Sequence, residues 1–203
     1  IIGQDFSRRF NYNFFNTEEM LLANANTYQI ININTFESKI FHSTEIGGIG
    51  AIAIHPEKKI FAIAECGEFP NIYIYEFPSL KLYRILRKGT ERGYTTINFN
   101  ARGDMLASVG SDPDYNLLIW NWANESIILK AKAFSQEIFN VQFSSNIEGK
   151  LITSGLGHIK FWTMANTFTG LKLQGELGKF GQIDLSDVSA FVEYPDGKVL
   201  SGT

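Results

Sequence analysis

The stretch Asn116-Leu117-Leu118-Ile119-Trp120-Asn121-Trp122 decides the fold of this chain, because similar stretches stand on both sides of it. Apolar residues two positions apart, ending in an aromatic, also occur at Ile72-Tyr73-Ile74-Tyr75-Glu76 and at Ile159-Lys160-Phe161-Trp162-Thr163. Side chains alternate between the two faces of a β-strand, so each stretch predicts a strand. The chain is therefore expected to be a repeat of one strand-rich unit.

The spacing of these strands indicates the size of the unit. Tyr75, Trp120 and Trp162 hold the same place in the pattern and are 45 and 42 residues apart. A weaker copy places Ile31 another 44 residues upstream of Tyr75. A period of about 40–45 residues with four short strands per unit is typical of WD40-type propeller blades. We therefore predict an all-β fold, a WD40-type β-propeller.

Turn residues between the strands set the limits of the units. The predicted blades cover about 6–45, 46–90, 91–133, 134–186 and 187–203, of which the first and the last are partial. The first is expected to lack its front strand and the last to stop after two strands. A propeller blade needs a neighbour on each face, so four to five blades form an incomplete propeller. The chain also begins without a methionine or a signal-peptide pattern, and we expect it to be an internal segment.

Composition excludes several classes of protein. The chain has 203 residues, of which 44% are hydrophobic and 19% charged, as in ordinary globular domains. Its formal net charge of −3 argues against a nucleic-acid or anionic-membrane binder, and no apolar run reaches the length of a membrane-spanning helix. Cys66 is the single cysteine, so neither an intrachain disulfide nor a cysteine-based zinc site is expected.

The two tryptophans of the repeated strands are the expected core anchors. Trp120 and Trp162 are predicted to fill the wedge between neighbouring blades, which widens away from the propeller axis. Many WD repeats also hold a buried network of aspartate, histidine, serine or threonine, and tryptophan. Asp112 is the aspartate expected in the corresponding turn, whereas no Gly-His pair precedes a first strand.

Two regions are candidate protein-interaction sites. The first is the one basic cluster of the sequence, which consists of Arg84, Arg87, Lys88 and Arg92. It is either a solvated loop between blades or a contact for an acidic partner. The second region, Thr163 to Ser186, is predicted to be the longest inter-strand region, with one outer strand at Leu171 to Gln174, and carries Phe168, Lys179 and Phe180. Long loops on a rigid scaffold often carry contacts.

Other motifs are better explained by structure than by chemistry. Gly47, Gly48 and Gly50 precede a strand rather than a helix, so they indicate a tight turn rather than a phosphate-binding loop. Asp112 and Asp114 are too few for calcium, which takes six or more oxygen ligands, and are expected at a hairpin tip. The histidines are scattered over three units, and no nucleophile stands with a base. We therefore expect no metal, no cofactor and no catalytic residues.

Several segments resemble one family. They are Ile46 to Pro56, Pro70 to Leu80, Ala133 to Gln136, Phe168 to Gly175 and Tyr194 to Val199. In these segments the chain is similar to the WD-repeat cilia- and flagella-associated proteins of the axonemal dynein tether complex, and the similarity extends over nearly the whole chain.

The resemblance implies a role for the chain. It implies a non-enzymatic scaffold in the axoneme of cilia and flagella, which helps to hold an inner-arm dynein motor on doublet microtubules and so supports beating. The implied partners are a paralogous WD-repeat tether subunit, the inner-arm dynein heavy chain and tubulin, with neither nucleic acid nor membrane. The rival hypothesis is a general cytosolic or microtubule-associated WD40 adaptor that binds peptides of its partners.

Overall fold

The computed structural model describes residues 9–180 and 186–203, and it is built almost entirely of β-strands. The described part contains four antiparallel sheets of four strands each, followed by a two-stranded sheet. Each sheet is a run of consecutive strands in chain order, which is the pattern of propeller blades. The predicted all-β propeller fold is confirmed, as a set of blades that does not close into a ring.

The first sheet has more strands than the sequence suggested. Its strands are β1 (Tyr12–Phe14), β2 (Glu19–Asn24), β3 (Thr27–Asn32) and β4 (Ser38–His42), in that order. The prediction of a blade without its front strand was wrong, because β1 pairs with β2 from Tyr12 opposite Leu22 to Phe14 opposite Met20. The predicted start of this unit at Phe6 lies outside the described residues.

The second and third sheets follow the predicted order of four strands. The second contains β5 (Ile49–Ile54), β6 (Ile60–Glu65), β7 (Ile72–Glu76) and β8 (Leu82–Leu86). The third contains β9 (Tyr94–Phe99), β10 (Leu106–Gly110), β11 (Asn116–Asn121) and β12 (Ser126–Lys132), with the short 3-10 helix η1 (Trp122–Asn124) between the last two.

The fourth sheet differs from the prediction in its outer half. It contains β13 (Ile138–Phe143), β14 (Lys150–Gly155), β15 (His158–Thr167) and β16 (Gly170–Leu177). The predicted outer strand at Leu171 to Gln174 is confirmed as part of β16, whereas the loop predicted from Thr163 onward is wrong as far as Thr167, where β15 ends. Residues 181–185 of that loop lie outside the described part. The last sheet pairs β17 (Ala190–Glu193) with β18 (Val199–Gly202).

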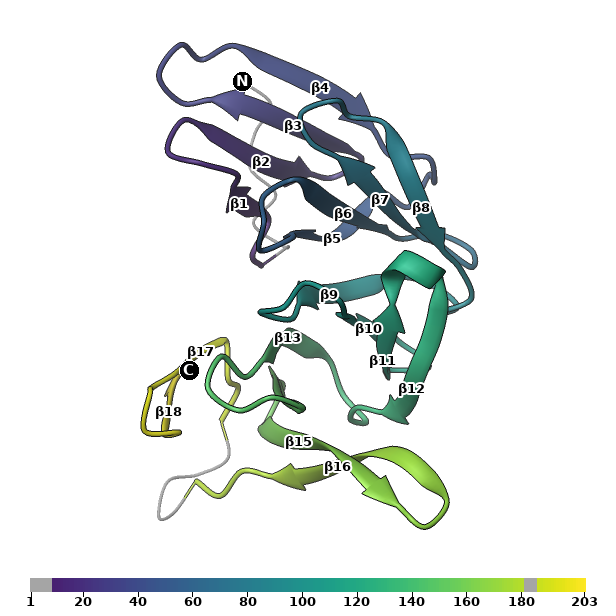
Figure 1. Cartoon of the computed structure of the whole chain (residues 1–203), viewed down its shortest axis with the longest axis vertical. Helices are drawn as coiled ribbons and strands as arrows, with labels where there is room; N and C mark the ends of the chain where they lie inside the picture. Colours follow the sequence, from purple (N-terminus) through teal and green to yellow (C-terminus); the bar gives the residue numbers. More distant parts are fainter. Residues whose placement is uncertain (1–8, 181–185) are drawn as a thin grey trace.

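The sheets follow one another along an arc (Figure 1), and the first strands of the first four sheets, β1, β5, β9 and β13, lie side by side. Gly50 of β5 shows how close they come, because a Cβ atom there would collide with the carbonyl oxygen of Tyr94 in β9. Because the chain passes from one sheet to the next at β4–β5, β8–β9 and β12–β13, we propose 46–90, 91–133 and 134–186 as the blade limits.

Apolar cores fill the spaces between successive sheets. Leu21 and Ile30 of the first sheet pack with Phe61 and Ile63 of the second. Trp120 is fully buried in the core between the second and third sheets, and Trp162 is 3% exposed in the core between the third and fourth. Both tryptophans therefore fill the wedge against the preceding sheet, as predicted. Each core belongs to two sheets, so no blade is stable without a neighbour.

Candidate protein-interaction surfaces

Half of the predicted basic cluster takes part in contacts between blades. Arg84, in β8, donates from Nε to the carbonyl oxygen of Ala123 at 2.9 Å. Its Nε and the Nη1 of Arg87 also lie 3.9 and 3.8 Å from the carboxylate of Glu125, which follows η1 in the third sheet. These cations are partly neutralised by an acid of this chain, and they link the second blade to the third.

The other half of the cluster is available to solvent. Lys88 and Arg92 are exposed and belong to no ion pair within the described residues. Arg92 lines an open depression with Glu68, Phe69 and Glu91, and the Phe69 side chain is 64% exposed. The structure thus divides the four predicted basic residues into two that link blades and two that are exposed, of which Arg92 lies beside acidic residues.

Phe168, Lys179 and Phe180 lie in three different environments. Phe168 is at the tip of the β15–β16 hairpin and is fully exposed. Lys179 is exposed just after β16, whereas the Phe180 ring is half-buried against a core formed by Ile152, Ile159, Val188 and Phe191. Of these three side chains, Phe168 projects furthest from the blade cores, and Phe180 contributes to one of them.

Hydrogen bonds hold the two tryptophans in their blades. Trp120 donates from Nε1 to Ser108 Oγ at 2.8 Å, and Trp162 donates to Thr153 Oγ1 at 2.9 Å. The acceptors stand on the strand next to each tryptophan, on β10 and β14. Since an unpaired indole N–H is costly in a core, each hydroxyl fixes its tryptophan. These pairs form the serine or threonine half of a WD-type network.

The aspartate of the third blade is not the predicted one. Asp114, rather than Asp112, receives hydrogen bonds from Thr90 Oγ1 at 3.1 Å and from Asn116 Nδ2 at 2.9 Å. It ties the turn after β10 to the connection that enters β9. Thr90 was not a predicted site residue. The one indication in the sequence is its position, four residues before Tyr94, where the first strand of the third blade begins.

The predicted glycine turn is a close contact between blades. Gly48 has a φ of +81°, in the left-handed region that favours glycine. A Cβ atom on Gly47 would collide with the backbone of Cys66, in the loop after β6. The glycines let the chain cross from the first sheet to the second, and they form no phosphate-binding loop before a helix.

Glu65 is a buried carboxylate at that same crossing. Its side chain accepts hydrogen bonds from the backbone N–H groups of Thr44 at 2.7 Å and Glu45 at 2.9 Å. Burial raises the pKa of this carboxyl above its ordinary value, and the two N–H donors oppose that rise. Glu65 thus holds the β4–β5 connection against the end of β6.

His55 is a structural histidine. Its Nδ1 accepts from the N–H of Glu57 at 3.2 Å, so Nε2 carries the proton and donates to the carbonyl oxygen of Gly103 at 3.0 Å. Trp122 donates to the same carbonyl at 2.6 Å. The bond from His55 joins the turn after β5 to the turn after β9 and so links the second and third blades, while the bond from Trp122 holds η1 against the same turn.

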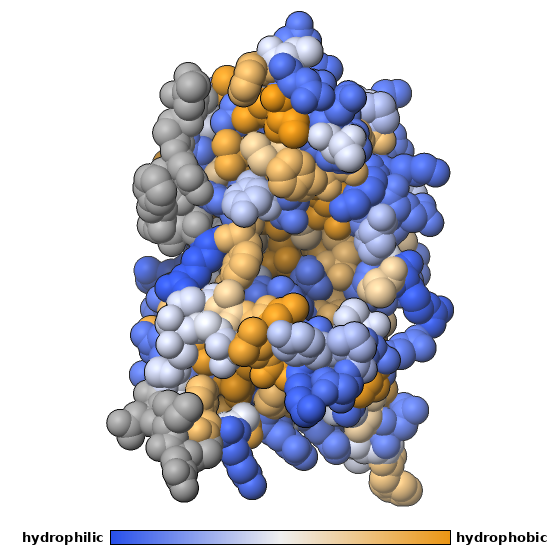
Figure 2. Space-filling model, turned by 90° about the vertical axis from the view of Figure 1, so that its left-hand side faces the viewer, coloured by the Kyte–Doolittle hydropathy of each residue, from blue (hydrophilic) through white to orange (hydrophobic). Residues whose placement is uncertain are grey.

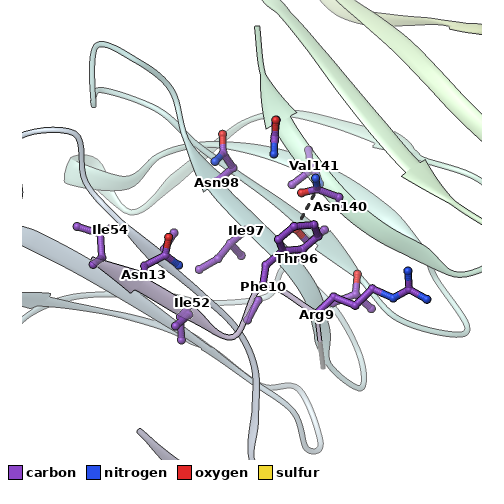
Figure 3. A pocket seen from close by; sticks show the side chains of 14 residues that line it. Arg9, Phe10, Asn13, Ile52, Ile54, Thr96, Ile97, Asn98, Asn140 and Val141 are labelled. Carbon is purple, nitrogen blue, oxygen red and sulfur yellow. Dashed lines mark hydrogen bonds between the residues drawn. The ribbon is translucent and has the colours of Figure 1, made fainter. Parts of the chain in front are cut away.

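The first strands line a small pocket on the concave side of the arc. Apolar residues gather along the middle of this side, where the surface is hollowed (Figure 2). The pocket has a volume of about 140 Å³ and is lined by residues around β1, β5, β9 and β13. Figure 3 shows Asn13, Asn98 and Asn140 around it, while the guanidinium end of Arg9 points away from them.

This pocket offers amide groups and hydroxyls but no acid–base pair. None of the residues that line it is an aspartate, a glutamate, a histidine or a cysteine. Across residues 9–180 and 186–203, no three such side chains gather closely enough to hold a metal ion. Within the same ranges, no helix is long and apolar enough to cross a membrane.

Known proteins resemble this chain along nearly its whole length. It is 49% identical to cilia- and flagella-associated protein 44 of Mus musculus over 201 residues, which is 99% of this chain and 11% of the mouse protein. The protein of that name from Chlamydomonas reinhardtii is 47% identical over 99% of the chain and 12% of its own length. The one from Trypanosoma brucei brucei is 40% identical over 91% of the chain. The chain thus spans about a tenth of the length of these relatives.

More distant similarity reaches two further proteins. Mouse cilia- and flagella-associated protein 43 is 26% identical over 76% of the chain. Echinoderm microtubule-associated protein-like 4 of Xenopus laevis is 27% identical over the same share. No family model matches the chain.

Proposed function

Because this chain is homologous over nearly its whole length to cilia- and flagella-associated protein 44, and is thus a WD-repeat sequence of cilia and flagella, we propose that it works as a non-enzymatic scaffold of the axoneme. In this role it helps to tether an inner-arm dynein motor on doublet microtubules and so supports beating. The observation that carries the proposal is the identity of 40–49% to proteins of three distant organisms.

The physical properties of the blades support a scaffold. The blades share their cores, and the seams between them carry hydrogen bonds such as the one from His55 to Gly103. Binding to such a rigid body costs little ordering of the backbone. Loops on its two ends and edge can therefore hold partners at fixed distances.

Three partners belong to this proposal. The similarity to cilia- and flagella-associated protein 43 supports a paralogous WD-repeat subunit as one partner. The inner-arm dynein heavy chain and tubulin are the other two. The exposed residues Lys88, Arg92, Phe168 and Lys179 are the proposed contact residues on this chain.

A second candidate is a microtubule-associated adaptor that binds peptides of its partners. The observation in its favour is the 27% identity to a protein whose name describes it as microtubule-associated. It predicts microtubule binding that does not require a dynein or a second WD-repeat subunit.

One experiment separates the two. A small density label fused to the full-length protein in a flagellated cell is located by electron tomography of demembranated axonemes. We expect one label per axonemal repeat, next to an inner-arm dynein motor, and slower beating when the gene is deleted. Labels scattered along microtubules without a fixed distance to dynein would favour the adaptor and contradict the tether.

A further inference from the structure

The β15–β16 hairpin is longer than its blade. β14 pairs with β15 only as far as Lys150 opposite Thr163, yet β15 and β16 continue to pair for four more positions, up to Thr167 opposite Gly170. Met164 anchors the base, because its N–H donates to the carbonyl oxygen of Gly149 at 2.7 Å. The three pairs beyond it project by about 10 Å at about 3.4 Å per residue.

The repeat shows that this projection is not part of the blade design. The third strands of the first three sheets, β3, β7 and β11, have six, five and six residues, whereas β15 has ten. A two-stranded ribbon without a third strand is marginally stable in water. The other blades pack with shorter third strands, so packing of the blade does not require the extra length of β15.

The tip of the hairpin is a hydrogen-bonded turn that carries one apolar side chain, Phe168. Thr167 Oγ1 donates to the carbonyl oxygen of Gly170 at 2.7 Å and lies 3.2 Å from Thr169 Oγ1. These bonds close the turn and leave the Phe168 side chain fully exposed. A phenyl ring held outward on a closed turn loses little conformational entropy when it is buried by a partner.

One face of the hairpin leads from the core to this ring. Side chains alternate along strands, so Met164, Leu173 and Leu171 share the face of Trp162. Met164 and Leu173 pack against the core between the third and fourth sheets, whereas Leu171, nearer the tip, is 39% exposed. Asn166, opposite Leu171, is polar and exposed on the same face, so Leu171 carries the apolar surface toward the tip, where Phe168 lies in the turn.

We propose that this hairpin, Met164 to Leu173, is a docking arm whose Phe168 ring enters an apolar pocket of a partner protein. A convex tip with one projecting ring fits a concave site, and buried aromatic anchors carry much of the energy of protein interfaces. The inference deepens the proposed function, in which Phe168 is one of the contact residues, and it rests on the scaffold binding a protein.

Charge favours a protein partner over a lipid surface. Within the arm, Lys172 is the single charged residue. Each cation near an anionic membrane contributes only about 1 kcal/mol, and one ring with one leucine buries too little area for stable insertion. An apolar pocket in a protein can bind the Phe168 ring without several cations around it.

The test uses the full-length protein in flagellated cells. The photoreactive amino acid p-benzoylphenylalanine replaces Phe168, and demembranated axonemes are irradiated. The matched control is the same replacement of Phe36, which is 81% exposed in the β3–β4 connection, the equivalent connection of the first blade. We expect one protein adduct from position 168 that the control does not give, identified by mass spectrometry.

The identified protein is then purified, and its binding to the full-length chain is measured. We expect Phe168→Ser to weaken binding about 10- to 100-fold and Phe36→Ser to change it less than about 2-fold. Both residues are exposed, so the two variants should melt at the same temperature as the parent.

Several results would overturn the arm. They are no adduct at position 168, an adduct with lipid alone, an adduct between two copies of this chain, and unchanged binding of Phe168→Ser. If the protein nevertheless occupies its normal place in the axoneme, the scaffold role stands without the arm. A protein absent from the axoneme would contradict the scaffold role itself.

Discussion

At the scale of single residues, the buried tryptophans show how one side chain connects two blades. Trp120 is fully buried, packs in the core between the second and third sheets, and has its only polar atom bonded to Ser108. We predict that Trp120→Ala lowers the free energy of unfolding by about 3–5 kcal/mol, as for other large aromatics removed from cores.

Thermal denaturation of the full-length protein checks this value, with limited proteolysis at each temperature used to detect unfolding of the propeller. Tyr194→Ala is the control, since Tyr194 is 48% exposed in the turn between β17 and β18, and its loss should cost less than about 0.5 kcal/mol. Equal shifts of the melting temperature in the two variants would contradict a core role for Trp120.

Glu65 gives a prediction of pH dependence with a definite sign. Its pKa in the folded state is raised above the ordinary value of 4.5, mainly by burial. The folded protein therefore holds this proton more tightly than the unfolded chain. The stability that the proton contributes is fully present below pH 4.5, and it is lost as pH rises through the folded-state pKa.

The substitution Glu65→Gln removes this titration and leaves one acceptor oxygen for Thr44 and Glu45. We expect the difference in stability between parent and variant to change with pH across that window and to become constant above it. Melting temperatures of both proteins measured at matched pH values test this. A difference that does not vary with pH would show that Glu65 titrates as in the unfolded chain.

At the scale of elements, one residue at the end of η1, Glu125, has a strained backbone conformation and also forms an ion pair with the second blade. Glu125 closes the 3-10 helix with a φ of +54°, and its carboxylate lies near Arg84 and Arg87. Left-handed backbone costs a non-glycine residue about 1 kcal/mol, whereas an exposed ion pair contributes about 0–1 kcal/mol.

These magnitudes predict opposite outcomes for two substitutions. Glu125→Ala keeps the strain and loses the pair, so it should destabilise the protein by up to about 1 kcal/mol. Glu125→Gly loses the pair and relieves the strain, so it should be neutral or stabilising by a few tenths of a kcal/mol. Chemical denaturation in low and high salt measures both, and a glycine variant less stable than the alanine variant would contradict the assignment.

The strands that the sequence predicts well are those with strong alternation. Ile72–Glu76 and Asn116–Asn121 alternate branched and aromatic residues and lie between clear turns, and both are strands. β1 has three residues in a segment rich in asparagine, so its pairing depends on β2 rather than on its own pattern. The outer half of β15 has the sequence Met-Ala-Asn-Thr, without apolar alternation, so the sequence predicts a loop there.

At the scale of the whole molecule, the sequence predicts the repeat and its register but not what the blades bring together. The basic cluster could be identified along the chain, whereas Glu125, which neutralises part of it, stands about 40 residues away in the next blade. The choice between Asp112 and Asp114 depends on which carboxylate faces Thr90 once the turn is formed. Such pairings are tertiary, and no local pattern contains them.

The seam between the third and fourth blades tests whether the blades behave as one unit. In β13, the N–H of Val141 donates to Thr96 Oγ1 at 3.3 Å, and the N–H of Phe143 donates to Asn98 Oδ1 at 3.1 Å. Both acceptors are side chains of β9, so they connect one first strand to the next. An unsatisfied buried N–H costs about 1–3 kcal/mol.

We predict that Thr96→Val combined with Asn98→Leu lets the fourth and fifth sheets open more often than the first three. Hydrogen exchange of the full-length protein should become about 10-fold faster or more in β13, with little change in β5 to β8. Thr95→Val is the matched control, because the Thr95 hydroxyl bonds to Val109 within its own sheet. If exchange rose equally in every sheet, all the blades would open together, and the two bonds would not stabilise this seam in particular. If exchange rose in β13 alone, the stability of the propeller would be a sum of terms for each pair of neighbouring blades. One seam could then open while the other seams stay closed.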